Sequence, residues 1–114
     1  MHNNDKIVFV FDVDGTLECG DPKGPIKLRM LKRMKDKGFI VGIVGAYEKV
    51  QPYIKNLDFY FEGDPHKPEN MRKVREKFNP FLGFYIADLP RDRIVALENG
   101  FCYIKPEDFK LMEE

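Results

Sequence analysis

The sequence predicts an α/β fold in three layers, with a mostly parallel central sheet of about five strands and helices on both of its faces. Short apolar runs alternate along the chain with segments whose apolar residues recur at helical spacing. This alternation is typical of parallel strands joined by crossover helices. The connections are short and rich in Gly, Pro and Asp, which favours turns over further domains. We therefore expect residues 1–114 to form a single core domain.

The first predicted strand is the apolar run Ile7–Phe11, which consists of β-branched and aromatic residues. A continuous run of this kind is typical of a strand buried on both faces, in the middle of a parallel sheet. Two carboxylates follow it, Asp12 and Asp14, and Gly15 then permits a tight turn. The two acids should lie at the carboxyl end of a central strand, where open α/β sheets bind ligands.

The next elements are predicted between residues 25 and 61. Pro25 suits the first turn of a helix and Gly38 suits its end. The apolar residues between them recur at helical spacing: Ile26, Met30, Leu31 and Met34. A strand, a short helix limited by Pro52, and a third strand follow at residues 39–44, 48–57 and 58–61.

The second half of the chain repeats the alternation. Pro68 opens a helix whose apolar residues face inward, and Asn79 with Pro80 ends it. The remaining elements are a strand, a helix, a strand and a terminal helix, at residues 82–87, 92–98, 101–104 and 106–112. Asp88 directly follows the fourth strand, so we expect it on the same edge of the sheet as the first acids.

Composition and charge narrow the function classes. The formal net charge is zero, which argues against a general electrostatic grip on nucleic acid or membrane and leaves nucleic acid only as a substrate. The chain has no apolar run of membrane-spanning length, and its N-terminus does not resemble a signal peptide. Cys19 and Cys102 are too few for a disulfide framework, so we predict free thiols in a cytoplasmic protein.

The carboxyl ends of the predicted strands bring a chemically coherent set of residues to one rim. The set comprises Asp12, Asp14, Thr16, Gly45, Ala46, Lys67, Asp88 and Asp92. Neighbouring carboxylates repel one another unless a cation or a shared proton separates them, and Mg²⁺ prefers oxygen ligands. A lysine and backbone N–H groups complement phosphoryl oxygens. The rim therefore predicts a site for Mg²⁺ and a phosphate.

Three motifs in this order resemble the haloacid dehalogenase-like hydrolase superfamily: Asp12-Val-Asp-Gly-Thr-Leu17, then Lys67-Pro68, then Asp88-Leu-Pro-Arg-Asp92. The resemblance covers residues from about 6 to 105, and its first motif is the specific one. It implies a Rossmann-like core and a phosphatase that cleaves a phosphorylated substrate, because an acid at Asp14 can supply the proton that ester cleavage needs.

The resemblance also implies a role for each matching residue. Asp12 would be the nucleophile that forms an aspartyl-phosphate, and Asp14 would exchange protons with the leaving oxygen and with water. The Mg²⁺ positions would be Asp12, Asp14 through its backbone carbonyl, Asp88 and Asp92, the last either binding the ion or orienting its ligands. The phosphate-binding positions would be Thr16, Gly45, Ala46 and Lys67.

The chain departs from that family in two ways. Gly45 stands where a Ser or Thr hydroxyl usually binds the phosphoryl group, and losing one such donor typically costs about 10²–10³ in rate. The segments 18–24 and 62–66 are too short to hold a cap domain. Such a protein would take a large substrate, borrow a lid from a second subunit, or hydrolyse small phosphates with little selectivity.

Several alternatives stay open at this level. The whole chain could be a catalytically degenerate module that binds metal and a phosphorylated partner without turnover. The phosphorylated molecule could be small or macromolecular in either case. Among single residues, Asp92 could be a helix cap and Lys67 an ordinary surface lysine. A phosphoacceptor receiver domain is disfavoured, because its acceptor acid should end the third strand, whereas Asp58 opens that strand and the two acids Asp12 and Asp14 close the first.

Overall fold

The computed structural model of the protein describes residues 6–113, with side chains described up to residue 109. Five strands lie in this range: β1 (Ile7–Phe11), β2 (Ile40–Gly45), β3 (Phe59–Glu62), β4 (Leu82–Ile86) and β5 (Cys102–Ile104). The helices are α1 (Leu28–Asp36), α2 (Tyr47–Val50), the 3-10 helix η2 (Ile54–Asn56), α3 (Lys67–Phe78), α4 (Pro90–Glu98) and α5 (Pro106–Glu113). All strands pair in parallel in the order β3-β2-β1-β4-β5, which confirms the predicted α/β fold.

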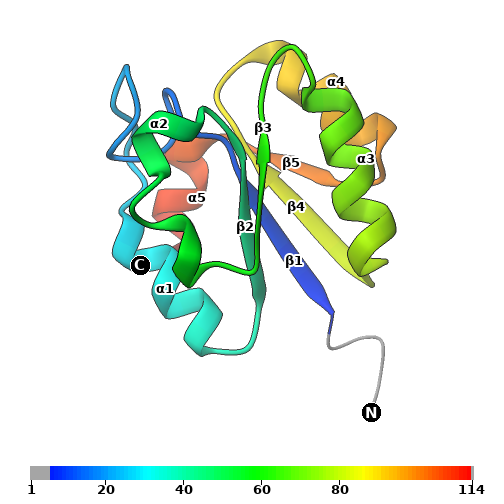
Figure 1. Ribbon diagram of the computed structural model, residues 1–114, viewed down its shortest axis with the longest axis horizontal. Coiled ribbons are helices and arrows are strands. Elements are labelled where there is room, and N and C mark those ends of the chain that lie inside the picture. The colour runs from blue at the N-terminus through cyan, green and yellow to red at the C-terminus, as the bar shows by residue number, and fades with distance from the viewer. Residues whose placement is uncertain (1–5, 114) are drawn as a thin grey trace.

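The sheet separates two apolar layers, which Figure 1 shows as α1 and α5 on one side and α3 and α4 on the other. Phe11 of β1 packs in the layer of α1 and α5, together with Met30 and Phe109. Val10, the preceding residue, packs in the opposite layer with Met71 of α3. Alternate side chains of β1 therefore enter two different cores, and this explains why the strand is apolar at every position.

The strand order determines where a ligand can bind. The chain passes from β1 through β2 to β3 on one side of the sheet, then crosses to β4 and β5 on the other. The loops that follow β1 and β4 therefore diverge, and open α/β sheets bind ligands at such a switch point. Asp12 and Asp88 belong to these two loops.

The first helix begins later than predicted. α1 begins at Leu28, whereas Pro25 and Ile26 remain in the connector. Ile26 pairs with Leu17 in a parallel bridge, which holds its backbone extended. The Glu18 carboxylate accepts the backbone N–H of Leu28 at 2.8 Å and so satisfies one donor of the first turn. Pairing of the connector with the first loop overrides the helical spacing of the apolar residues.

Other boundaries also differ from the predictions. The short helix predicted over residues 48–57 is divided into α2 and η2 around Pro52, which has no N–H to continue the hydrogen-bond ladder. α4 begins at Pro90, two residues before the predicted start at Asp92. The connectors at 18–24 and 62–66 carry no cap domain, as predicted. Within residues 6–113 no helix has the length and apolar character needed to span a bilayer.

Candidate functional site

Three carboxylates meet beyond the carboxyl ends of β1 and β4. One oxygen atom from each of Asp12, Asp88 and Asp92 lies within 4.8 Å of the others. The backbone N–H of Asp12 donates to the carbonyl of Ile86 at 2.9 Å, so the pairing of β1 with β4 continues up to the first acid. Gly15 makes room for Asp88: its φ is +76°, and a Cβ there would overlap the Asp88 carboxylate. The glycine of the first motif is therefore required by close approach as well as by backbone conformation.

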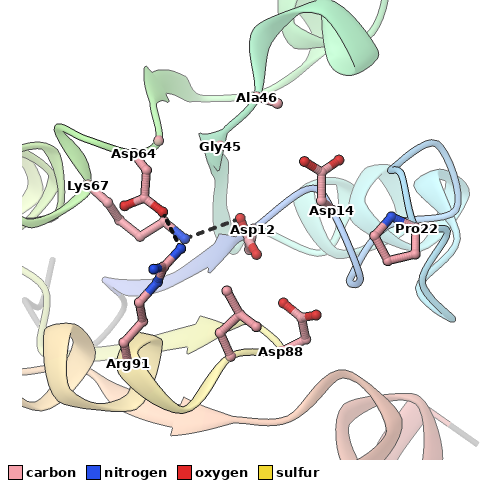
Figure 2. A pocket seen from close by; sticks show the side chains of 11 residues that line it. Asp12, Asp14, Pro22, Gly45, Ala46, Asp64, Lys67, Asp88 and Arg91 are labelled. Carbon is pink, nitrogen blue, oxygen red and sulfur yellow. Dashed lines mark hydrogen bonds and ion pairs between the residues drawn. The ribbon is translucent and has the colours of Figure 1, made fainter.

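Lys67, the first residue of α3, places its ammonium group among these acids. Its Nζ donates to Asp92 Oδ1 at 2.9 Å and to Asp12 Oδ1 at 3.4 Å, and Figure 2 shows it reaching toward Asp12. Burial lowers the pKa of Lys67, but the negative charges of Asp12 and Asp92 outweigh burial, so the pKa is raised. The side chain also lies over the ring of buried Tyr85, with Nζ 5.7 Å from the ring centre. Lys67 is thus a buried, charged group and not a surface lysine.

Burial and the neighbouring acids disfavour the ionisation of Asp12 more than Lys67 favours it. Burial raises its pKa, Lys67 opposes this effect, and Asp92 and Asp88 reinforce it, so that the pKa is about 6. Three carboxylates share a single ammonium group, and a divalent cation would supply the missing positive charge. A donor set made of carboxylate oxygens is the environment that Mg²⁺ prefers. The cluster is therefore a candidate acidic metal site, and its residues fit Mg²⁺.

The raised pKa of Asp12 predicts a pH-dependent stability in the absence of metal ions. The pKa is 3.8 ordinarily and about 6 in the folded protein, so the folded state holds this proton more tightly than the unfolded chain. The free energy of unfolding should therefore decrease by about 3 kcal/mol as pH rises from about 4 to about 6, with the full loss present above pH 6. Urea unfolding in EDTA measures this decrease.

The Asp12→Asn variant isolates that contribution from the other carboxyl groups. The difference in unfolding free energy between variant and wild type should grow between about pH 4 and pH 6. Mg²⁺ added to the wild type at pH 7 should restore stability, because the cation favours the ionised carboxylate. A difference that is the same at every pH would show that the folded state does not hold the Asp12 proton.

Asp92 caps a helix, which is one of the roles that the sequence left open, and it also contacts Lys67. Its side chain is fully buried, and both of its oxygens are engaged. Oδ1 accepts the hydrogen bond from Lys67, and Oδ2 accepts the backbone N–H of Leu89 at 3.2 Å, which caps α4. A metal ion bound directly to Asp92 would compete with both donors. The geometry therefore favours Asp92 as the residue that positions Lys67.

Asp14 lies apart from this cluster. Its carboxylate accepts the backbone N–H of Asp21 at 2.9 Å and lies 3.9 Å from Lys49 Nζ, and its side chain is 45% exposed. In Figure 2, Asp12 lies between Asp14 and Lys67. Asp14 and Asp12 nevertheless line the same cavity, whose volume is about 410 Å³. This position exposes the carboxylate of Asp14 to solvent and leaves it outside the three-acid cluster.

The other residues predicted to contact a phosphate differ in their accessibility. Thr16 is fully buried, and its Oγ1 has no hydrogen-bond partner within residues 6–109. Its carbonyl accepts the backbone N–H of Ile26 at 3.0 Å, so Thr16 connects the first loop to the connector. Gly45 and Ala46 line the cavity at the end of β2, whereas Thr16 is not one of its lining residues.

Gly45 has no space for a side chain. A Cβ at this position would lie 2.7 Å from Val13 Cγ2 and 3.0 Å from the backbone nitrogen of Val13. On the other side, a Cβ on Gly63 would lie 3.0 Å from the Gly45 Cα. The end of β2 is therefore packed closely between the segments at Val13 and Gly63, and glycine at position 45 permits this packing.

We expect Gly45→Ser to lower the free energy of unfolding by about 1–3 kcal/mol, because fully buried Val13 must move to admit the new atoms. Ala46→Ser is the matched control: Ala46 is exposed at the edge of the same cavity, and its change should stay within about 0.5 kcal/mol. Urea unfolding of both variants provides the comparison. Equal stability of the two would contradict the tight packing at Gly45.

Two charged residues that line the cavity, Asp64 and Arg91, were not predicted as site residues. Arg91 Nη2 donates to Asp64 Oδ2 at 2.9 Å, and the pair joins the loop before α3 to the first turn of α4 (Figure 2). Each of them neighbours a motif that the sequence did reveal, since Asp64 lies in the turn before Lys67 and Arg91 directly precedes Asp92. Their pairing spans 27 residues of sequence, and no local pattern signals it.

The fold and this cluster define a class: an α/β protein with a five-stranded parallel sheet and a candidate acidic metal site beside its carboxyl edge. A scan of protein-family models, a search of curated proteins and a search of solved structures each gave no match to the chain. A parallel α/β sheet supports many unrelated activities, so the function must be argued from the site.

Proposed function

We propose that the protein is a Mg²⁺-dependent phosphomonoester hydrolase that acts through an aspartyl-phosphate. The observation that carries this proposal is the buried ammonium group of Lys67 between Asp12 and Asp92, at the base of an open cavity rimmed by further acids. An anionic phosphate needs positive charge to approach these carboxylates, and Lys67 with a divalent cation would supply it. The likeness of the three motifs to haloacid dehalogenase-like hydrolases supports the same chemistry.

The residues have distinct tasks in the proposed reaction. Mg²⁺, held by Asp12, Asp88 and the backbone carbonyl of Asp14, would neutralise the phosphoryl oxygens. An Asp12 oxygen attacks phosphorus, the ester P–O bond breaks, and Asp14 protonates the leaving oxygen. Water then attacks phosphorus, Asp14 takes its proton, and cleavage of the bond between phosphorus and Asp12 releases inorganic phosphate. Lys67 stabilises the negative charge of the phosphoryl oxygens in both steps.

Gly45 favours a second candidate function, a module that binds metal and a phosphorylated partner without turnover. A side chain at Gly45 could be admitted only if Val13 moved, and the loss of one donor typically costs about 10²–10³ in rate. Ala46→Ser would offer a hydroxyl to the same cavity from an exposed position. An increased rate in this variant would indicate a weakened hydrolase, because a binding module has no rate to increase.

The test is a panel of phosphate esters with Mg²⁺ or with EDTA. The panel should contain an aryl phosphate, sugar phosphates, nucleotides and a phosphopeptide. We expect release of inorganic phosphate only when Mg²⁺ is present. Calorimetric binding of Mg²⁺ and phosphate without any turnover would favour the second candidate, and the absence of both binding and turnover would rule out the two together.

A further inference from the structure

Arg91 and Asp64 form an ion pair at the mouth of the cavity that the proposed reaction uses. Their side chains are 67% and 50% exposed, and both line the cavity together with Asp12 and Lys67. Figure 2 shows the pair on the Lys67 side of Asp12, away from Asp14. Burial, Asp12 and Asp92 have larger effects on the pKa of Lys67, but the charge of Asp64 also raises it. The ion pair is therefore a close electrostatic neighbour of the proposed phosphate position.

The guanidinium group of Arg91 has capacity for a further anion. It carries five N–H donors, and within residues 6–109 its one hydrogen bond goes to Asp64. An exposed ion pair of this kind contributes little to stability, because solvent screens it. Charge-assisted, bidentate hydrogen bonds from Arg to phosphate or carboxylate are roughly twice as strong as neutral ones. Arg91 can therefore share or exchange its contact with Asp64 for an anionic group of a ligand.

Lys49, another exposed cation near this cavity, is less suited to the task. Lys49 Nζ lies 3.9 Å from Asp14 and 4.0 Å from Asp21, between two carboxylates that both attract it. It is not one of the residues that line the cavity, whereas Arg91 is. Arg91 also has the planar donor geometry that matches phosphate and carboxylate groups.

We propose that Arg91 binds a second anionic group of the substrate, which is a small phosphate monoester with a further phosphate or carboxylate near the reacting one. This inference rests on the proposed hydrolase function. The first phosphate would lie against Lys67, and the second anion would face Arg91 within the same cavity of about 410 Å³. A substrate with a single phosphate does not contact Arg91, which stays paired with Asp64. Arg91 therefore adds nothing to the affinity for such a substrate.

Steady-state kinetics with matched substrates test the proposal. A hexose bisphosphate and the corresponding hexose monophosphate differ by one phosphate, and a phosphoglycerate carries a carboxylate instead. In the wild type, kcat/KM should be higher for the substrates with two anionic groups. Arg91→Ala should lower this preference about tenfold, mainly through KM, and Arg91→Lys should retain part of it. The substrate whose advantage is lost identifies the second anion as phosphate or carboxylate.

Arg93→Ala is the matched control, because Arg93 is exposed on the same helix but does not line the cavity. It should keep the wild-type preference. A loss in Arg91→Ala that is the same factor for one-anion and two-anion substrates would overturn the inference. No turnover of any substrate would instead contradict the proposed function. In that case equal calorimetric affinities of wild type and Arg91→Ala for the bisphosphate with Mg²⁺ would overturn the inference separately.

Discussion

Asp12→Asn is expected to lower kcat for Mg²⁺-dependent hydrolysis by about 10⁴-fold or more, because an amide cannot attack phosphorus or carry the phosphoryl group. Asparagine keeps the shape of the side chain and an oxygen that can accept the hydrogen bond from Lys67 Nζ. The variant also removes a buried carboxylate whose ionisation is unfavourable, so it should fold at least as stably as the wild type without metal. The loss of rate would therefore be chemical and not structural.

Hydrolysis of an aryl phosphate measures the rate. Borohydride reduces an aspartyl-phosphate to homoserine and releases phosphate, so mass spectrometry of the reduced protein should find homoserine in place of Asp12 in the wild type only. Asp36→Asn is a suitable control, because Asp36 is an exposed acid on α1 that pairs with Lys32 at 3.1 Å. Its rate should match that of the wild type. Retained activity in Asp12→Asn together with lost activity in Asp14→Asn would assign the nucleophile to the second acid instead.

Lys67→Met is expected to lower the free energy of unfolding by about 3–5 kcal/mol at pH 7 in EDTA. Methionine has a similar length but leaves the Asp92 carboxylate without its ion-pair partner, and the Asp92 side chain is fully buried. Asp12 loses its opposing charge in the same step, so its pKa should rise further. An effect of this size is a large fraction of the 5–15 kcal/mol that a typical domain has in total. Urea or thermal unfolding measures it.

Two further variants separate charge from packing. Lys73→Met replaces an exposed lysine on the same helix and should change stability by no more than about 0.5 kcal/mol. The double variant Lys67→Met with Asp92→Asn should be more stable than Lys67→Met alone, because the unpaired buried charge has been removed as well. A loss below about 1 kcal/mol in Lys67→Met would mean that the ammonium group is better hydrated than its burial implies.

The strands were predictable because their signal is local. β1 matches its predicted bounds, Ile7–Phe11, since a strand buried on both faces must be apolar at each position. The start of α1 was not predictable, because Ile26 has both a helical spacing and a bridging partner, Leu17, in the first loop. The bridge forms only when the two segments meet, and it then decides the conformation of the connector.

The candidate site was predictable to the level of its rim. The rule that ligands bind beyond the carboxyl ends of parallel strands gathered Asp12, Asp88 and Asp92, whose oxygens the structure brings within 4.8 Å of each other. The same rule could not separate Asp14 from them. The direction of each side chain in a turn depends on the backbone conformation of that turn, which the rule does not predict. Nor could it reveal Arg91, whose partner is distant in sequence.

By itself, the sequence determined which segments form strands, which edge of the sheet carries the acids, and where glycine is needed for the first turn. Those properties follow from side-chain shape and from spacing along the chain. Only the tertiary structure decided that Lys67 is buried between Asp12 and Asp92, and that a Cβ at Gly45 would crowd Val13. Desolvation and ion pairing depend on which groups surround a side chain, and the folded chain alone brings those groups together.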